Sequence, residues 1–171
     1  TPIVVPIIAA AGLKIPKTSS RSITSPAGTA DTMEVFTNVK IPLSKMYEVV
    51  EKENGCMVWG GSFDLSPADD IIIHVEHPLG LDFEVQMIAS ILSKKKSAGS
   101  SLVLIDIPFG KTAKVTTKEH AIHLRDKFER IGKSVGLKVI GIITDGSQPI
   151  GNGIGPLKEA QDILKILKRE E

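Results

Sequence analysis

The chain of 171 residues is long enough for one substantial hydrophobic core. Its formal net charge of +1 and its aromatic content of 4% argue against a surface built for nucleic acid, and the apolar run at its start is too short to span a membrane. The single cysteine, Cys56, excludes an internal disulfide and suits a reducing compartment, so we expect a cytoplasmic protein.

The first third of the chain contains a short apolar helix, a long polar stretch and an amphipathic helix. Residues 4–11 predict a helix that ends at Gly12. Residues 14–31 are rich in Ser, Thr, Pro and Gly, which is typical of a surface loop, although loops of this length are often functional. Residues 43–53 predict an amphipathic helix that the following Asn-Gly pair ends.

From residue 56 onward, strand and helix patterns alternate. The apolar run 101–107 is nearly unbroken, as expected for a central strand that is covered on both faces. The run 71–75 is extended or, alternatively, a buried helix. A capping box at residues 116–119 predicts the start of a helix. In all, we expect strands at residues 56–59, 101–107 and 137–144, and helices at residues 82–97, at residues 116–135 and from Pro156 onward.

This alternation predicts an α/β fold in which helices flank a mostly parallel central sheet on both faces, and we expect residues 1–171 to form a single α/β domain. Ligands of such sheets bind beyond the C-terminal ends of the strands, where loops 108–115 and 145–155 lie. The second loop contains Gly-Asn-Gly-Ile-Gly, which fails the dinucleotide fingerprint because Pro156 stands at the third glycine position. A tight turn and an anion contact at the helix start are both open interpretations of that loop.

Three groups of side chains are candidates for binding an anion or a base. Hydroxyls gather around Arg21 and Gly28 in the polar stretch, and hydroxyls with a guanidinium suit a phosphate. Ser90 and Lys94 are four residues apart on one predicted helix and therefore share a face. Lys114 follows a predicted strand and either reaches a phosphate or stays solvated.

Five segments, taken together and in this order, resemble one enzyme family. They are Lys17-Thr-Ser-Ser-Arg-Ser-Ile-Thr-Ser-Pro-Ala-Gly-Thr-Ala-Asp31, Cys56-Met-Val-Trp-Gly-Gly61, Ser66-Pro-Ala-Asp-Asp70, Ile88-Ala-Ser-Ile-Leu-Ser-Lys-Lys95 and Asp145-Gly-Ser-Gln-Pro-Ile-Gly151. The chain resembles the AMP phosphorylase and thymidine phosphorylase family, in the branch of archaeal AMP phosphorylases and bacterial type 2 thymidine phosphorylases, and the resemblance runs from end to end.

The resemblance implies phosphorolysis of an N-glycosidic bond. AMP and phosphate would give adenine and ribose 1,5-bisphosphate, or thymidine and phosphate would give thymine and 2-deoxyribose 1-phosphate. Asp82 is implied to be the proton donor, a role that can coexist with capping its helix. Bound phosphate is the nucleophile, so no cofactor, metal or protein nucleophile is required. The substrate- and phosphate-binding residues are implied to be Ser19, Ser20, Arg21, Ser22, Ile23, Thr24, Ser25, Thr29, Ser90, Lys94 and Lys114.

Three positions depart from the family pattern, because His74, His77 and Asn152 stand where relatives carry arginine. Since histidine is only partly charged near neutrality, these changes weaken the case for a nucleotide and keep a non-catalytic nucleotide-binding module as an alternative. The resemblance further implies that a helical domain, a glycine-rich phosphate loop and a C-terminal part lie outside this chain. The chain alone is then expected to be inactive. The full-length protein is expected to be a homo-oligomer. We expect it to bind small molecules and not to bind nucleic acid or membranes.

Overall fold

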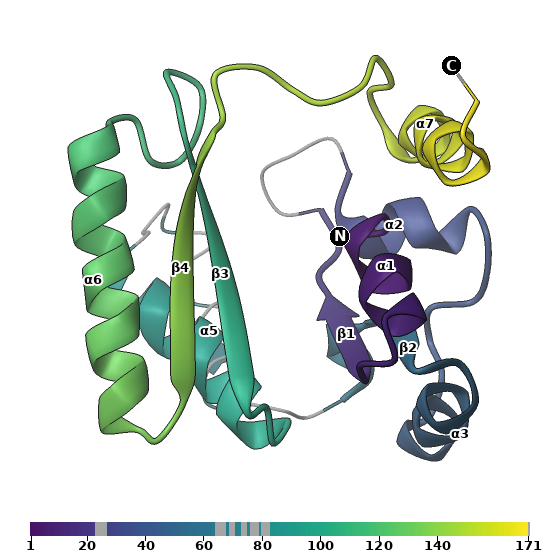
Figure 1. Ribbon diagram of the computed structural model, residues 1–171, viewed down its shortest axis with the longest axis horizontal. Coiled ribbons are helices and arrows are strands. Elements are labelled where there is room, and N and C mark those ends of the chain that lie inside the picture. Colours follow the sequence, from purple (N-terminus) through teal and green to yellow (C-terminus); the bar gives the residue numbers. More distant parts are fainter. Residues whose placement is uncertain are drawn as a thin grey trace. The chain divides into compact units, whose positions relative to one another are not determined.

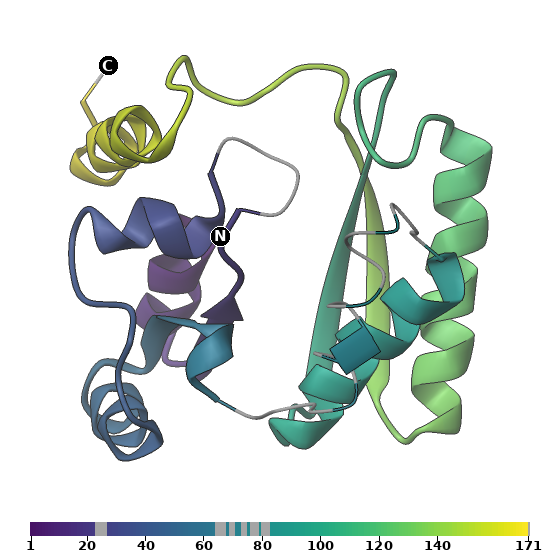
Figure 2. The ribbon, with the colours of Figure 1, turned by 180° about the vertical axis from the view of Figure 1, so that it is seen from behind.

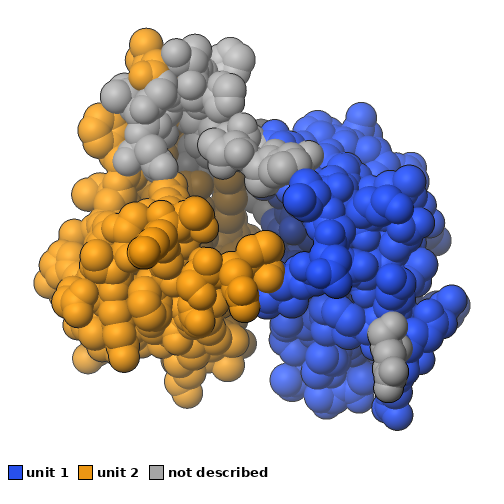
Figure 3. Space-filling view, turned by 90° about the horizontal axis from the view of Figure 1, so that it is seen from above, with its two compact units in different colours: residues 1–64, 150–171 blue, residues 65–149 orange. Residues whose placement is uncertain are grey.

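The computed structural model describes residues 1–22, 27–63, 68, 71–72, 75, 79 and 83–170. The chain forms two compact units (Figure 3): unit 1 is residues 1–64 and 150–171, and unit 2 is residues 65–149. Within the described residues, each unit contains one pair of parallel strands and the helices that pack on it. Parallel strands combined with helices confirm the predicted α/β class.

Unit 1 is built on the parallel pair β1 (Ile15–Ser19) and β2 (Gly55–Trp59). Ser19 lies opposite Trp59 in the register, so both strands end at the same edge of the sheet. The helices of this unit are α1 (Val4–Ala10), α2 (Thr29–Glu34), α3 (Leu43–Glu53) and α7 (Pro156–Lys168), and a 3₁₀ turn (Gly60–Ser62) follows β2 (Figure 1). The helices expected at residues 4–11 and 43–53, and the one that starts at Pro156, are confirmed.

Helices cover both faces of the β1–β2 sheet. Because successive residues of a strand point to opposite faces, Gly55 and Cys56 belong to different ones. A side chain at Gly55 would press against Val5 of α1, so α1 lies on that face. Cys56 and Val58 are buried on the other face, where they pack with Val50 of α3.

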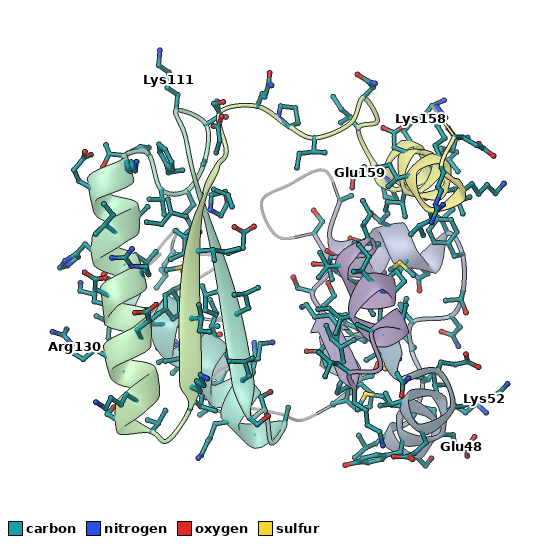
Figure 4. The ribbon with its side chains drawn as sticks, viewed as in Figure 1. Glu48, Lys52, Lys111, Arg130, Lys158 and Glu159 are labelled. Carbon is teal, nitrogen blue, oxygen red and sulfur yellow. The ribbon has the colours of Figure 1, made fainter. Side chains whose placement is uncertain are left out.

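The C-terminal helix α7 packs against α2 within unit 1. Thr32 of α2 is buried at this contact, and its hydroxyl bonds to Glu159 Oε2 at 3.2 Å and to the carbonyl oxygen of Gly28 at 3.4 Å. Figure 4 labels Glu159 on α7. Ala160 of α7 is also buried, so the end of the chain is tied to the helix that follows the polar stretch.

Unit 2 is built on the parallel pair β3 (Leu102–Phe109) and β4 (Lys138–Asp145), which keep one register along their whole length. Helices α5 (Glu84–Ser97) and α6 (Lys118–Ser134) pack with β3 around one core (Figures 1 and 2). The buried residues of this core are Ile88, Leu92, Val103, Ile107, Val115, Ala121, Leu124, Phe128 and Leu137. The predicted strands and helices of this half are therefore present.

The strand expected at residues 101–107 is present as β3, and among the described residues of unit 2 the helices α5 and α6 pack on one of its faces. Val103 and Ile107 are buried, but Leu102 and Leu104 are 56% and 59% exposed. Ile140 on β4 is exposed as well. An unbroken apolar run lacks the alternation that would tell a covered face from an open one, so the sequence pattern could not reveal this.

Two local expectations are corrected, and for a third the structure favours one of its two alternatives. The polar stretch 14–31 is not a continuous loop, since β1 lies within it and is held by pairing with β2. The capping box at residues 116–119 is replaced by Thr117, whose hydroxyl accepts the N–H of His120 at 3.2 Å. The described residues of the run 71–75 are helical, and the others lie outside the described residues.

None of the helices in the described ranges is long and apolar enough to cross a membrane.

Candidate functional site

The polar stretch after β1 folds back onto the start of α2. The N–H of Ala30 donates to the carbonyl oxygen of Ser20 at 3.2 Å. A side chain at Gly28 would lie 2.6 Å from that same oxygen and 2.6 Å from the nitrogen of Ser22, so the close approach requires glycine. We call the described residues of this fold-back the hydroxyl cradle: Ser19, Ser20, Arg21, Ser22, Gly28 and Thr29.

One carboxylate, that of Asp31, joins the two sides of the hydroxyl cradle. Its Oδ2 accepts the backbone N–H of Ser22 at 2.7 Å and that of Gly28 at 3.0 Å, and its Oδ1 accepts Nη1 of Arg21 at 2.8 Å. The N–H bonds from Ser22 and Gly28, together with the Arg21 guanidinium, hold the pKa of Asp31 below its usual range. Asp31 is therefore ionised at neutral pH.

The guanidinium of Arg21 is shared by two carboxylates and an indole ring. Glu34 accepts two bonds from it, at 2.6 and 2.8 Å, in addition to the bond to Asp31. These bonds lower the pKa of Glu34 as well. The guanidinium carbon lies 5.3 Å from the centre of the Trp59 ring, and Nζ of Lys40 lies at the same distance. The charge of Arg21 is thus matched by its neighbours within unit 1.

Trp59 connects the segment 56–61 to the hydroxyl cradle. It is the last residue of β2, opposite Ser19, and its N–H donates to the carbonyl oxygen of Val39 at 2.9 Å. A side chain at Gly61 would overlap the Trp59 ring, so the glycine after β2 makes room for the indole. Two of the segments that carry the family resemblance therefore meet at one place.

Helix α5 of unit 2 carries Ser90 and Lys94, which are half-buried and four residues apart on one face, as predicted. The next residue, Lys95, is also half-buried, and burial together with the charge of Lys94 lowers the pKa of Lys95. The lysines at residues 94–96 lie in the last turn of the helix, where positive charge interacts favourably with the helix dipole. The face thus offers a hydroxyl and a cation side by side.

The loops that follow β3 and β4 meet at the C-terminal edge of the sheet of unit 2, as predicted. The N–H of Gly146 donates to the carbonyl oxygen of Phe109 at 2.8 Å, and a side chain at Gly110 would lie 2.6 Å from the oxygen of Gly146. The loop between β3 and α6 carries Lys114, which is exposed. Lys111 of the same loop extends away from the sheet (Figure 4).

The glycine-rich loop before α7 is tied to its own helix. Asp162 Oδ2 accepts the N–H of Asn152 at 2.9 Å and that of Gly153 at 2.7 Å, and Glu159 Oε1 accepts the N–H of Gly155 at 3.3 Å. These bonds to Asn152 and Gly153 lower the pKa of Asp162. These bonds fit the tight-turn interpretation of the loop, and an anion contact at the start of α7 stays a prediction.

The structure describes part of the predicted site. Unit 1 brings together Ser19, Ser20, Arg21, Ser22 and Thr29, whereas Ser90, Lys94 and Lys114 belong to unit 2. The predicted residues Ile23, Thr24, Ser25 and Asp82, and the departures His74 and His77, lie outside the described residues. The meeting of all these residues around one substrate stays a prediction.

Three residues around the hydroxyl cradle have no role predicted from the sequence: Asp31 bonds to its backbone, and Glu34 and Trp59 contact Arg21. A spacing signal exists for Asp31, because an acidic residue three positions after Gly28 fits the second half of a capping box. Glu34 follows three residues later and shares the same helix face. Trp59 carries no such signal, since its position beside Arg21 depends on the register between β1 and β2.

Comparison with known proteins identifies the family. Residues 2–123 match the glycosyl transferase family, a/b domain. The chain is 58% identical over 168 residues to a protein of Nitrobacter hamburgensis, 59% identical over 165 residues to one of Rhodopseudomonas palustris, and 57% identical over 168 residues to one of Legionella pneumophila, each named "Putative thymidine phosphorylase". These matches cover 98%, 96% and 98% of this chain but 33%, 32% and 32% of the relatives, so the chain spans about a third of their length. Since the family match extends over most of its residues, the chain belongs to the glycosyl transferase family and contains its a/b domain.

Proposed function

We propose that this chain is the α/β part of a longer phosphorylase, which uses inorganic phosphate to cleave the N-glycosidic bond of a nucleoside or nucleotide. The observation that carries the proposal is the hydroxyl cradle, in which Ser19, Ser20, Ser22 and Thr29 lie where the backbone folds back on itself. Serine and threonine hydroxyls can donate hydrogen bonds to an oxyanion. Membership of the glycosyl transferase family supports a glycosyl transfer, and the names of the relatives support a nucleoside phosphorylase.

In the proposed reaction, an oxygen of bound phosphate attacks the anomeric carbon while the bond to the base breaks. Positive charge develops on the sugar and negative charge on the base. Asp82 donates a proton to the leaving base, Lys94 offsets its negative charge and Ser90 contacts it. Lys114 binds the substrate as a flexible point charge. The main contribution of the hydroxyl cradle is to position the nucleophile.

Two substrates are candidates. AMP is favoured by the resemblance of residues 17–31 to archaeal AMP phosphorylases. Thymidine is favoured by the names of the relatives and by Asn152, which stands where the family carries arginine. The engagement of Arg21 by Asp31 and Glu34 also leaves fewer cations for the 5′-phosphate of AMP.

The experiment that tests the proposal is incubation of the full-length protein with phosphate and either AMP or thymidine. Chromatography then measures the free base. Adenine with ribose 1,5-bisphosphate identifies an AMP phosphorylase, and thymine with 2-deoxyribose 1-phosphate identifies a thymidine phosphorylase. A folded full-length protein that releases neither base from its substrate contradicts the proposed function.

A nucleotide-binding module without turnover is the alternative from another class. Asp82→Asn in the full-length protein separates the two, because the amide keeps the shape of the side chain and cannot donate the proton. We expect kcat to fall by about 10²–10⁴-fold. An unchanged kcat would remove the proposed role of Asp82.

As part of the same proposal, the protein acts in the cytoplasm on small molecules, without a cofactor, and assembles as a homo-oligomer through segments outside this chain.

A further inference from the structure

Asp31 places a negative charge in the region where we propose that phosphate binds. Its side chain is only 20% exposed, and both of its oxygens are engaged by Ser22, Gly28 and Arg21. Because like charges repel, a carboxylate beside an anion site weakens binding of the anion unless another, favourable interaction of that carboxylate outweighs the repulsion.

Hydrogen bonds from two backbone N–H groups to Asp31 supply this favourable interaction. Ser22 and Gly28 lie on opposite sides of the fold-back, and a single oxygen atom, Oδ2 of Asp31, accepts from both. Hydrogen bonds to a charged acceptor are about twice as strong as those between neutral groups. The negative charge of Asp31 therefore holds the serine-bearing side of the hydroxyl cradle against the start of α2, where Thr29 lies.

Arg21 balances this charge within unit 1. Its guanidinium bonds to Asp31 and to both oxygens of Glu34, and it lies over the Trp59 ring, which Lys40 also approaches. The two cations match the two carboxylates, so the group as a whole is neutral and does not repel an anion. An Arg21 that bound phosphate would have to give up the carboxylates that it holds here.

We infer that Asp31 is a positioning residue for the phosphate of the proposed reaction, and that Arg21 is its counter-charge instead of a ligand of the anion. The inference rests on the proposed function, because Asp31 can position phosphate only if the hydroxyl cradle binds it. Asp31 acts through the backbone of Ser22 and Gly28 and does not touch the reacting atoms.

The test is Asp31→Asn in the full-length protein, since the amide keeps the shape of the side chain and removes its charge. We expect the KM for phosphate to rise about tenfold or more, because the hydroxyls lose their alignment, while kcat and the KM for the nucleoside or nucleotide change less than about threefold. Amide hydrogen exchange at Ser22 and Gly28 should become faster in the same variant. A purely structural role would change all kinetic constants together.

Glu34→Gln is the matched control, because it removes a carboxylate from Arg21 without removing an acceptor from the backbone of the hydroxyl cradle. We expect its KM for phosphate to stay within about threefold of the wild type, with unchanged exchange at Ser22 and Gly28. Equal effects of the two variants, or an unchanged KM for phosphate in Asp31→Asn, overturn the inference.

The proposed function and this inference can fail separately. If the wild type catalyses no phosphorolysis, the proposed function fails. Calorimetric titration with inorganic phosphate then still compares the wild type with Asp31→Asn, and tenfold weaker binding by the variant, about 1.4 kcal/mol, supports the positioning role. Equal binding by both proteins, or no binding of phosphate by the wild type, overturns it.

Discussion

Asp31 and Asp162 have the same local role on different helices. Each places one oxygen where it accepts two backbone N–H groups of the preceding loop, Ser22 and Gly28 for the first and Asn152 and Gly153 for the second. Each carboxylate reaches back from its helix and occupies N–H donors that would otherwise be open to an external anion. The two loops differ in composition, since the hydroxyl cradle contains Ser19, Ser20, Ser22 and Thr29, whereas the glycine-rich loop has no hydroxyls between residues 151 and 155.

Cys56 gives a prediction at the scale of a single residue. The side chain is buried on the α3 side of the β1–β2 sheet, and burial raises the pKa of its thiol. Because the thiolate is the nucleophile, we expect the native chain to react with a thiol reagent at least about tenfold more slowly than the unfolded chain. The measurement is the rate of absorbance change with an aromatic disulfide reagent, in buffer and in denaturing urea.

The control for this labelling experiment is built into the sequence, because Cys56 is the single cysteine of the chain and the total signal must correspond to one thiol. A native rate equal to the denatured rate would contradict the burial of β2 beneath α3.

Gly132 gives a prediction at the scale of elements, at the contact between α6 and β4. A side chain at this position would overlap Val139, so the helix approaches the strand closely because it carries glycine there. Overpacking a core costs about 1–3 kcal/mol, and alanine regains up to about 1 kcal/mol of helix propensity. Because the added carbon would lie only 2.2 Å from Val139, the cost belongs in the upper part of that range. We therefore expect Gly132→Ala to lower the free energy of unfolding by about 1–2 kcal/mol, measured by urea denaturation.

The neighbouring Lys133, exposed on the same helix, provides the control for this substitution. Lys133→Ala should change the free energy of unfolding by less than about 0.5 kcal/mol. If Gly132→Ala were as stable as the wild type, α6 and β4 would not be as close as described.

Glu84 gives a prediction about pH, because it ties the start of α5 to α6. Its carboxylate accepts bonds from Lys127 at 2.5 Å and from His120 at 2.8 Å, and the first of these is the larger cause of its lowered pKa. A carboxyl whose folded pKa is lowered stabilises the fold above its unfolded pKa, and that contribution is lost as the pH falls through the folded value. We expect the wild type to be about 0.5–1 kcal/mol more stable than Glu84→Gln at pH 7, with the difference becoming smaller as the pH falls below the ordinary glutamate pKa of about 4.3.

Urea denaturation of both proteins at pH 7 and pH 3 measures this difference. The exposed Glu119 on α6 offers a matched substitution, Glu119→Gln, which removes a carboxylate from the same region without breaking the bonds between the helices. A difference between wild type and Glu84→Gln that is the same at both pH values would contradict the prediction.

Elements with a strong internal pattern could be predicted from the sequence, whereas contacts between distant segments could not. The spacing of residues 121, 124, 128, 131 and 135 predicts the buried face of α6. The structure buries Ala121, Leu124 and Phe128 and half-buries Ile131, whereas Val135, which follows the end of the helix, is 43% exposed. β1 was missed because its sequence, Ile-Pro-Lys-Thr-Ser, has no apolar alternation and becomes a strand only by pairing with β2. The same limit applies to the candidate site: the hydroxyl-rich segment stands out in the sequence, but the closure of that segment by Asp31 depends on how the chain folds back.

At the scale of the whole molecule, the proposed chemistry is divided between the two units. The hydroxyl cradle, which we propose binds phosphate, belongs to unit 1, and the Ser90–Lys94 face, which we propose contacts the base, belongs to unit 2. Transfer of a sugar from its base to phosphate requires the phosphate and the leaving base to be held on the same anomeric carbon and shielded from water. Under this proposal, activity requires both groups of residues to contact one substrate.

The relatives are about three times as long as this chain, and this leads to the last prediction. We expect the 171-residue chain to release base from AMP or thymidine at least about a hundredfold more slowly than the full-length protein, because misplacing reacting groups by about 1 Å already costs that factor. The measurement is base release by chromatography at equal protein concentration, with circular dichroism as the control that the chain is folded. Equal rates would mean that these 171 residues contain everything the reaction needs. In that case units 1 and 2 would form the active site without residues from outside this chain.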